Sequence, residues 1–250
     1  MHPRPQPVVV RILQLLAVVT LSACATTQTA RGADASTRLL ALLPMQSGFG
    51  PSDHDAYEAR IAPIAAEHGM VSESTYTVAK FLGGAGPSEA SSVGVWTLQA
   101  PGSLEGVMAD PRYQGESALR DRIHDMKRTV MFLAREEFAG AAPAPDHVLL
   151  VGALAMRPGF GFEEHSAYEA AVAPVAARHG MRLYRSFRVL KALGGASNIV
   201  AINIWELDSA EALSKVMADP EYVAKVEYRD RIHDMATTTM YLVNKRGGSR

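Results

Sequence analysis

The residues best suited to chemistry occur twice in this chain, in the same order. Arg120 and His124 lie four residues apart in the segment RDRIHDM, and the same seven letters recur with Arg229 and His233. At helical spacing, each arginine and its histidine share one side of a helix, where they could hold a carboxylate or phenolate ligand. The alternative is a solvated, salt-bridged helix end that fixes the strand after it.

A second pair, His54 and His165, lies just inside a predicted helix in each copy, next to a Gly-Phe-Gly turn. A neutral imidazole titrates near the working pH, so either side chain could donate or accept a proton. The alternative is that both occupy the first turn of a helix and face water. No catalytic residue is assigned from the sequence. The ligand-binding candidates are His54, Tyr57, Arg120, His124, His165, Tyr168, Arg229 and His233.

Other residues that could do chemistry favour structural roles. Trp96 and Trp205 fit a place in the core, with stacking on a flat ligand as the alternative. His68 and His179, at helix ends, would complement the helix dipole. The sequence has no Gly-x-Ser-x-Gly elbow, no His-Glu-x-x-His helix and no flavin or nicotinamide fingerprint. The two RDRIHDM histidines could meet across a pseudo-twofold axis, but two imidazoles are too few for a metal site. We therefore predict neither a metal nor a cofactor.

These residues are positioned by an internal repeat. The segment Gly48-Phe49-Gly50 recurs 111 residues later as Gly159-Phe160-Gly161, and Trp96 recurs 109 residues later as Trp205. A period near 110 residues is that of a small domain rather than of a solenoid unit.

Each repeat has the pattern of a β-α-β-β-α-β unit, which is the ferredoxin-like order. Two helices can cover only one face of a four-stranded sheet, yet the first and last strands are apolar on both faces. We therefore expect the two repeats to face each other through their sheets, with the helices outside. In the first copy, the predicted strands are 39–45, a strand closing at 83–84, 93–98 and 129–133. One predicted helix ends near 68. A second runs from 104 towards 124, and Pro111 is expected to restart or kink it.

Each repeat resembles the dimeric α+β barrel superfamily, which includes antibiotic-biosynthesis monooxygenases, EthD-like proteins and muconolactone isomerases. The resemblance rests on a helix with Tyr57, a Gly-Gly after the second strand, and Asp110-Pro111-x-Tyr113 followed by Arg120, and it is closest to short uncharacterised members. It implies a cavity between sheet and helices. Family members usually pair as homodimers, whereas this chain carries both halves. The predicted fold class is α+β, with two tandem ferredoxin-like βαββαβ repeats packed as an intramolecular dimeric α+β barrel.

The N-terminal segment predicts localisation to the bacterial cell envelope. A basic start precedes an apolar run that is too short to span a bilayer comfortably, and the run ends in Leu21-Ser22-Ala23-Cys24. This resembles the lipobox of bacterial lipoproteins, and Cys24, the only cysteine, would be the lipidation site. Ala25 after it favours the outer membrane, facing the periplasm. The predicted segments are 1–23 (signal peptide), 24–37 (tether), 38–138 (first domain), 139–147 (linker) and 148–246 (second domain).

Composition limits the partners. The net charge is −1 and no lysine- or arginine-rich run is present, which argues against nucleic acid. The expected partners are the membrane through the lipid anchor, a small-molecule ligand, and the other repeat as an intramolecular pseudo-dimer that could assemble further. The first functional hypothesis is a membrane-anchored protein that binds a small ligand or has a structural role. The alternative is a cofactor-free monooxygenase or isomerase acting on a small aromatic or lactone-like substrate, a hypothesis that rests on the fold.

Overall fold

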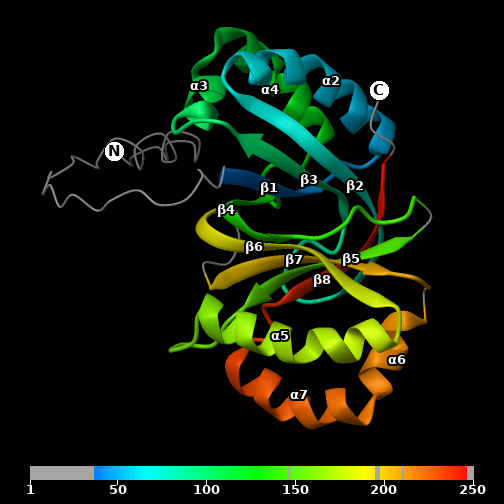
Figure 1. Ribbon diagram of the computed structural model, residues 1–250. Coiled ribbons are helices and arrows are strands. Elements are labelled where there is room, and N and C mark those ends of the chain that lie inside the picture. The colour runs from blue at the N-terminus through cyan, green and yellow to red at the C-terminus, as the bar shows by residue number, and fades with distance from the viewer. Residues whose placement is uncertain (1–36, 146, 195–197, 210, 247–250) are drawn as a thin grey trace, which may run out of the picture. The chain divides into compact units, whose positions relative to one another are not determined.

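The computed structural model describes residues 37–145, 147–194, 198–209 and 211–246, all within one compact unit. Eight strands form one closed antiparallel barrel in the order β1-β3-β2-β8-β5-β7-β6-β4 (Figure 1). The strands are β1 (Thr37–Pro44), β2 (Met70–Gly83), β3 (Ala90–Leu98), β4 (Val130–Ala139), β5 (Val148–Ala155), β6 (Met181–Gly194), β7 (Ile199–Leu207) and β8 (Thr239–Lys245). The predicted signal peptide and Cys24 lie outside the described residues.

Helices cover the barrel on two opposite sides, as Figure 1 shows. The first-repeat helices are α2 (Pro51–Glu67), α3 (Ser103–Ala109) and α4 (Pro111–Ile123), and the second-repeat helices are α5 (Phe162–Arg178), α6 (Ala212–Ala218) and α7 (Pro220–Ile232). The helix predicted from 104 to 124 is therefore two helices. Asp110 ends α3 and caps α4, where its carboxylate accepts a hydrogen bond from the Arg112 backbone N–H at 2.8 Å.

The predicted fold class, two tandem ferredoxin-like repeats that face each other through their sheets, is wrong. β2 pairs with β8 and β4 pairs with β6, so the strands of the two repeats hydrogen-bond to each other at both edges. The eight strands thus belong to one continuous barrel instead of two packed sheets. The pattern of apolar residues indicates which faces of a strand are buried, but it does not indicate which strands pair along their edges. Two separate sheets would leave edge strands with unpaired backbone groups, and the closed barrel pairs them.

Three apolar clusters explain why the strands are apolar on both faces. The barrel interior holds Tyr76, Phe132, Phe187 and Tyr241, each 1% exposed or less. A second cluster packs α2, α3 and α4 against the outside of β1 and β3, and a third packs the second-repeat helices against β5 and β7. Within the described residues, no helix is long and apolar enough to cross a membrane.

Buried charges link the two repeats at one end of the barrel. Arg185 on β6 is 7% exposed, and its guanidinium contacts Glu136 at 2.6 Å and Glu73 at 2.7 Å. Arg38 contacts the same two carboxylates, at 3.1 and 2.7 Å. Arg185 also lies 4.6 Å above the Phe187 ring. The Arg185 ion pairs join the second repeat to the first, whereas the Arg38 ion pairs lie within the first repeat.

Candidate functional site

The second repeat contains a cavity of about 380 Å³ between the helices α5, α6 and α7 and the strands β5, β7 and β8. Its walls are mainly apolar and include Leu150, Val172, Trp205 and Met240. Met217 lines it and is 54% exposed, so this side chain lies at the solvent side. A volume near 400 Å³ lies within the range of small-molecule sites, roughly 300–1,000 Å³.

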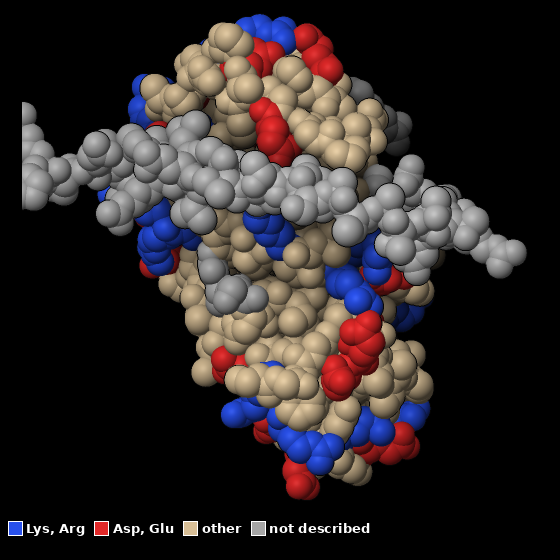
Figure 2. Space-filling view, turned by 90° about the vertical axis from the view of Figure 1, so that its left-hand side faces the viewer, with Lys and Arg blue, Asp and Glu red and all other residues tan. Residues whose placement is uncertain are grey.

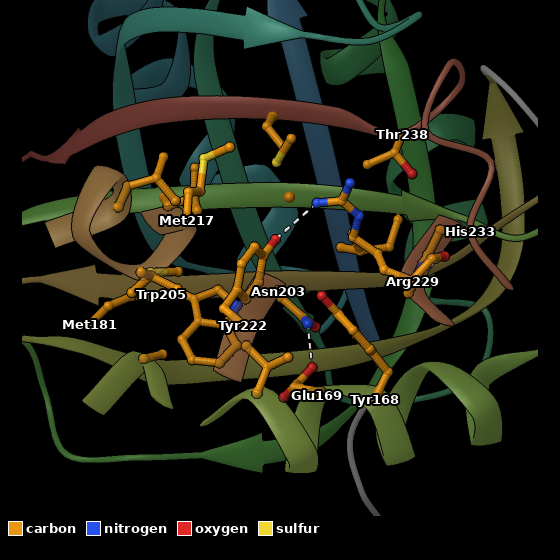
Figure 3. Close-up of a pocket in the computed structure, with 18 of the residues that line it drawn as sticks. Tyr168, Glu169, Met181, Asn203, Trp205, Met217, Tyr222, Arg229, His233 and Thr238 are labelled. Carbon is orange, nitrogen blue, oxygen red and sulfur yellow. Dashed lines mark hydrogen bonds between the residues drawn. The ribbon is translucent and has the colours of Figure 1, made fainter. Parts of the chain in front are cut away.

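Polar side chains gather along one side of this cavity (Figure 3). Tyr168 and Glu169 come from α5, Asn203 from β7, and Tyr222 and Arg229 from α7. Arg229 Nη1 donates to the Tyr222 hydroxyl at 2.9 Å. A guanidinium and a phenol held together in this way can bind an oxygen atom of a ligand that carries negative charge.

Two histidines of the lining, His165 and His233, form a hydrogen-bonded chain whose direction follows from the donors and acceptors at its ends. His233 Nδ1 lies 3.2 Å from the Arg229 backbone carbonyl, which can only accept, so Nδ1 carries the proton. Burial, and next the nearby His165, lower the pKa of His233 to about 4, so its ring is neutral at neutral pH. His233 Nε2 is therefore an acceptor, and His165 Nδ1 donates to it at 3.0 Å.

The other nitrogen of His165 faces a carboxylate and an amide. His165 Nε2 lies 3.2 Å from Glu169 Oε2 and 3.0 Å from Asn203 Nδ2, and Asn203 Nδ2 also donates to Glu169 Oε2 (Figure 3). Among the described residues, no hydrogen bond reaches Glu169 Oε1. The carboxylate thus has one oxygen fixed by the protein and one that is available on the cavity wall.

Tyr168 completes the polar side. Its ring contacts His233 edge to face at 5.3 Å between centroids. Burial, and next the neighbouring Tyr222, raise the pKa of the Tyr168 phenol above its ordinary value. Tyr168 therefore remains protonated at neutral pH and can donate a hydrogen bond.

The first repeat holds a similar arrangement with a different carboxylate environment. His54 Nδ1 lies 2.9 Å from His124 Nε2, and His124 Nδ1 lies 3.2 Å from the Arg120 carbonyl. His54 Nε2 lies 3.1 Å from Glu58 Oε2 but has no aligned hydrogen-bond partner among the described residues. Glu58 accepts hydrogen bonds from the hydroxyls of Ser72 and Thr75.

Those hydroxyls change the acidity of the first-repeat carboxylate. Burial raises the pKa of Glu58, but the nearby His54 and the hydrogen bonds from Ser72 and Thr75 together outweigh burial, and the pKa lies below its ordinary value. Both oxygens of Glu58 are thus held by hydroxyl donors, which makes it a weak base. Glu169, the matching residue of the second repeat, lacks these two donors.

The structure brings together most of the residues proposed from the sequence. His165, Tyr168, Arg229 and His233 line the second-repeat cavity. His54 and His165 are 5% and 3% exposed, so neither faces water. Arg120 Nη1 lies 3.3 Å from the Tyr113 hydroxyl.

In each RDRIHDM segment the histidine is the residue that ends the helix, four residues after the arginine, and in the second repeat both side chains line the cavity. His124 and His233 follow the last helical residues and each contacts the first-helix histidine of its own repeat. His68 and His179 pair with helix-capping aspartates, at 2.9 and 2.7 Å. Trp205 is both in the core and on the cavity wall.

Sequence reasoning missed Glu169, Asn203 and Tyr222. Glu169 follows His165 by four residues, a spacing that places both on one helix face and that recurs as His54 and Glu58. That spacing could have identified the pair. Asn203 occupies the position that Gly94 has in the first repeat. This difference between two otherwise similar strands could have identified Asn203. Within the described residues, no group of three or more His, Cys, Asp or Glu is arranged to hold a metal ion.

Several solved structures share this fold at low sequence identity. An anthrone oxidase-like protein matches with a TM-score of 0.55 and 14% identity over 87% of this chain and 95% of its own. A provisionally assigned monooxygenase from Lactobacillus acidophilus NCFM matches with 0.50 and 10%, over 84% and 94%. A variant of the chlorite dismutase from Candidatus Nitrospira defluvii matches with 0.51 and 9%, over 85% and 92%.

The fold is that of the dimeric α+β barrel proteins. The resemblance inferred from the sequence is therefore confirmed for the fold. No family model matches this chain, and no curated protein matches it.

The two neutral histidines predict a stability that is sensitive to acid. Burial, and next the adjacent first-helix histidine, lower the pKa of both His124 and His233 to about 4. In the unfolded chain each titrates near 6.5, so as the pH falls below 6.5 the unfolded state binds more protons and stability is lost. In urea titrations we expect the free energy of unfolding to reach its highest value above pH 6.5. Between pH 6.5 and pH 4 it should fall by on the order of 2 kcal/mol per histidine.

A double variant, His124→Gln with His233→Gln, isolates this contribution. Its unfolding free energy should change less between pH 6.5 and pH 5, where carboxylates of the unfolded chain are still largely ionised. A profile as steep as that of the original protein would show that other groups cause the acid sensitivity.

Proposed function

We propose that the second-repeat cavity binds a small aromatic molecule and that Glu169, assisted by His165, removes a proton from it. The observation that carries this proposal is the carboxylate itself. Glu169 lies on the wall of an apolar cavity, with one oxygen available and with a chain of two histidines bonded behind it. A general base needs this combination of access and a partner that stabilises the transferred proton.

The other polar residues fit the binding of such a substrate. Arg229 and Tyr222 can hold a substrate oxygen whose negative charge grows as the proton leaves. Trp205 and the aliphatic wall can contact a flat ring system. Tyr168 can donate a further hydrogen bond from the same side.

The reaction that this geometry supports best is oxygenation by O2 without a bound cofactor. Loss of a proton from a methylene between aromatic rings leaves a carbanion, and the proton passes to Glu169. The carbanion then gives electrons to O2. In the net reaction the CH2 group and one O2 become a carbonyl and one water, so one oxygen atom enters the product. The anthrone oxidase-like and monooxygenase structures of the same fold support this choice.

The test uses anthrone, a tricyclic ketone with one acidic methylene. With an oxygen electrode and chromatography, we expect the protein to accelerate O2 uptake and the formation of anthraquinone. An anaerobic titration measures binding separately. Binding without O2 uptake would exclude the oxygenase and support the binding role, whereas no binding of anthrone would overturn the aromatic-ligand proposal. A rearranged product with no O2 uptake would identify an isomerase.

We also propose that the protein is anchored to a membrane of the cell envelope, as the sequence predicts. A Cys24 acylated by several chains would hold the barrel on a membrane, at roughly 0.8 kcal/mol per buried CH2 group. The net charge of −1 fits a protein that does not bind nucleic acid. On the described surface that Figure 2 shows, basic and acidic side chains are interspersed.

Replacing Cys24 with Ala tests the anchor. The thiol is the acyl acceptor, so we expect the Cys24→Ala protein to leave the membrane fraction or to accumulate as an uncleaved precursor. Fractionation and intact-mass measurement would show either result. A processed Cys24→Ala protein that still sediments with membranes would contradict lipidation at this residue.

A further inference from the structure

We propose that Asn203 is a positioning residue that sets the proton arrangement of the second-repeat site, so that the two duplicated sites differ in chemistry. The inference deepens the proposed function and rests on it for its catalytic meaning. Its structural content, the location of one proton, stands without that function.

The orientation of the Asn203 amide follows from its neighbours. A carboxylate can only accept, so the amide nitrogen must face Glu169 Oε2. The Ser186 hydroxyl donates to Asn203 Oδ1 at 2.9 Å, which fixes the other end. Asn203 is 3% exposed and Ser186 5%, so water does not compete for these bonds.

This orientation decides which nitrogen of His165 carries a proton. The amide has two hydrogens, and both Glu169 Oε2 and His165 Nε2 lie on that side. His165 Nδ1 already donates to His233, whose own Nδ1 must donate to a backbone carbonyl. His165 Nε2 can therefore accept from Asn203 as a lone pair, which leaves it free to take up a proton that arrives at Glu169.

The first repeat shows the same site without the amide. Gly94 stands at the position of Asn203, so His54 Nε2 meets the Glu58 carboxylate directly, at 3.1 Å. A lone pair and a carboxylate at that distance repel each other unless a donor bridges them. In the second repeat, where the same two atoms lie 3.2 Å apart, the Asn203 amide is that donor. Gly94 in the first repeat supplies no such amide, so a proton should sit on His54 Nε2. A histidine that already carries this proton cannot relay another, and Glu58 is in addition held by two hydroxyls.

The experiment measures this proton directly. In protein labelled with ¹⁵N in its histidines, ring nitrogen shifts at neutral pH distinguish protonated from unprotonated nitrogens. Signals are assigned with His54→Gln and His165→Gln variants. We expect Nε2 of His165 to be unprotonated and Nε2 of His54 to be protonated. Equal states at the two positions would overturn the proposal.

Asn203→Leu removes the amide at similar volume. We expect a proton to appear on His165 Nε2, which would make this ring resemble His54. Should the Leu variant not fold, Asn203→Gly is measured instead, because the first repeat carries glycine at this strand position. An unprotonated Nε2 in the folded variant would show that Asn203 does not set the proton.

Kinetics separate this inference from the proposed function. If anthrone is a substrate, Asn203→Leu should lower kcat at least tenfold and change KM little, because the amide hydrogens are engaged by Glu169 and His165. A change in KM with kcat preserved would contradict a positioning role. If the protein does not oxidise anthrone but the proton moves as expected, the proposed function fails and the role of Asn203 stands.

Discussion

Exchange of Glu169 for Gln is expected to lower kcat for anthrone oxidation by roughly 10²–10⁴-fold, the usual contribution of a general base. The amide keeps the size of the side chain and can still bond Asn203 or His165, but it cannot take up a proton. Initial rates of O2 uptake at saturating anthrone measure the effect. Affinity, from the anaerobic titration, should change little because the base acts mainly in the transition state.

The first repeat supplies a matched control for this substitution. Glu58 occupies the same helix position, also four residues after a histidine, and both of its oxygens are bonded by hydroxyls. Glu58→Gln should therefore leave kcat within about twofold. Equal losses in the two variants would show that the glutamates act through the fold and not as a base.

A second large effect is expected at the seam between the repeats. Arg185→Met keeps much of the side-chain length but leaves two partly buried carboxylates, those of Glu73 and Glu136, with Arg38 as their shared cation. Removing one partner from a buried ion-pair cluster costs about 3–5 kcal/mol, because the cluster keeps an uncompensated and desolvated charge. Urea unfolding followed by circular dichroism should show a loss of this size.

Arg182 on the same strand provides the comparison. It pairs with Glu206 at 3.1 Å, but its side chain is 58% exposed, so Arg182→Met should cost about 1 kcal/mol or less. A small loss for both variants would mean that water or neighbouring groups compensate Glu73 and Glu136, and that the seam is not held by this arginine.

Much of the architecture was predictable because the chain repeats. The recurrence of Gly48-Phe49-Gly50 and Trp96 defined the repeat unit, and strands that are apolar on both faces required cover on both sides. The pairing of β2 with β8 was not predictable, because backbone hydrogen bonds along a strand edge leave no periodic trace in the side chains. The incorrect prediction of two facing sheets arose because the sequence does not indicate which strand edges pair.

The candidate site was predictable in its histidines and not in its carboxylate. His54 and His165 could be predicted because each is an imidazole beside a Gly-Phe-Gly turn, and an imidazole titrates near neutral pH. Glu169 is one of three glutamates in α5, and a glutamate usually faces water. Only the packing of α5 against β7 shows that it points inward, to Asn203.

The buried charged residues at the end of the barrel also influence which halves of the chain can pair with each other. The repeat places Ser74 at the position of Arg185, and Lys245 at the position of Glu136. Two copies of the first half, joined in the same way, would therefore bring Glu73 and Glu136 together with Arg38 but without Arg185. Two copies of the second half would gather Arg185 and Lys245 without those glutamates. Each half is therefore better matched in charge to the other half than to a copy of itself, and these charges favour pairing between two different halves.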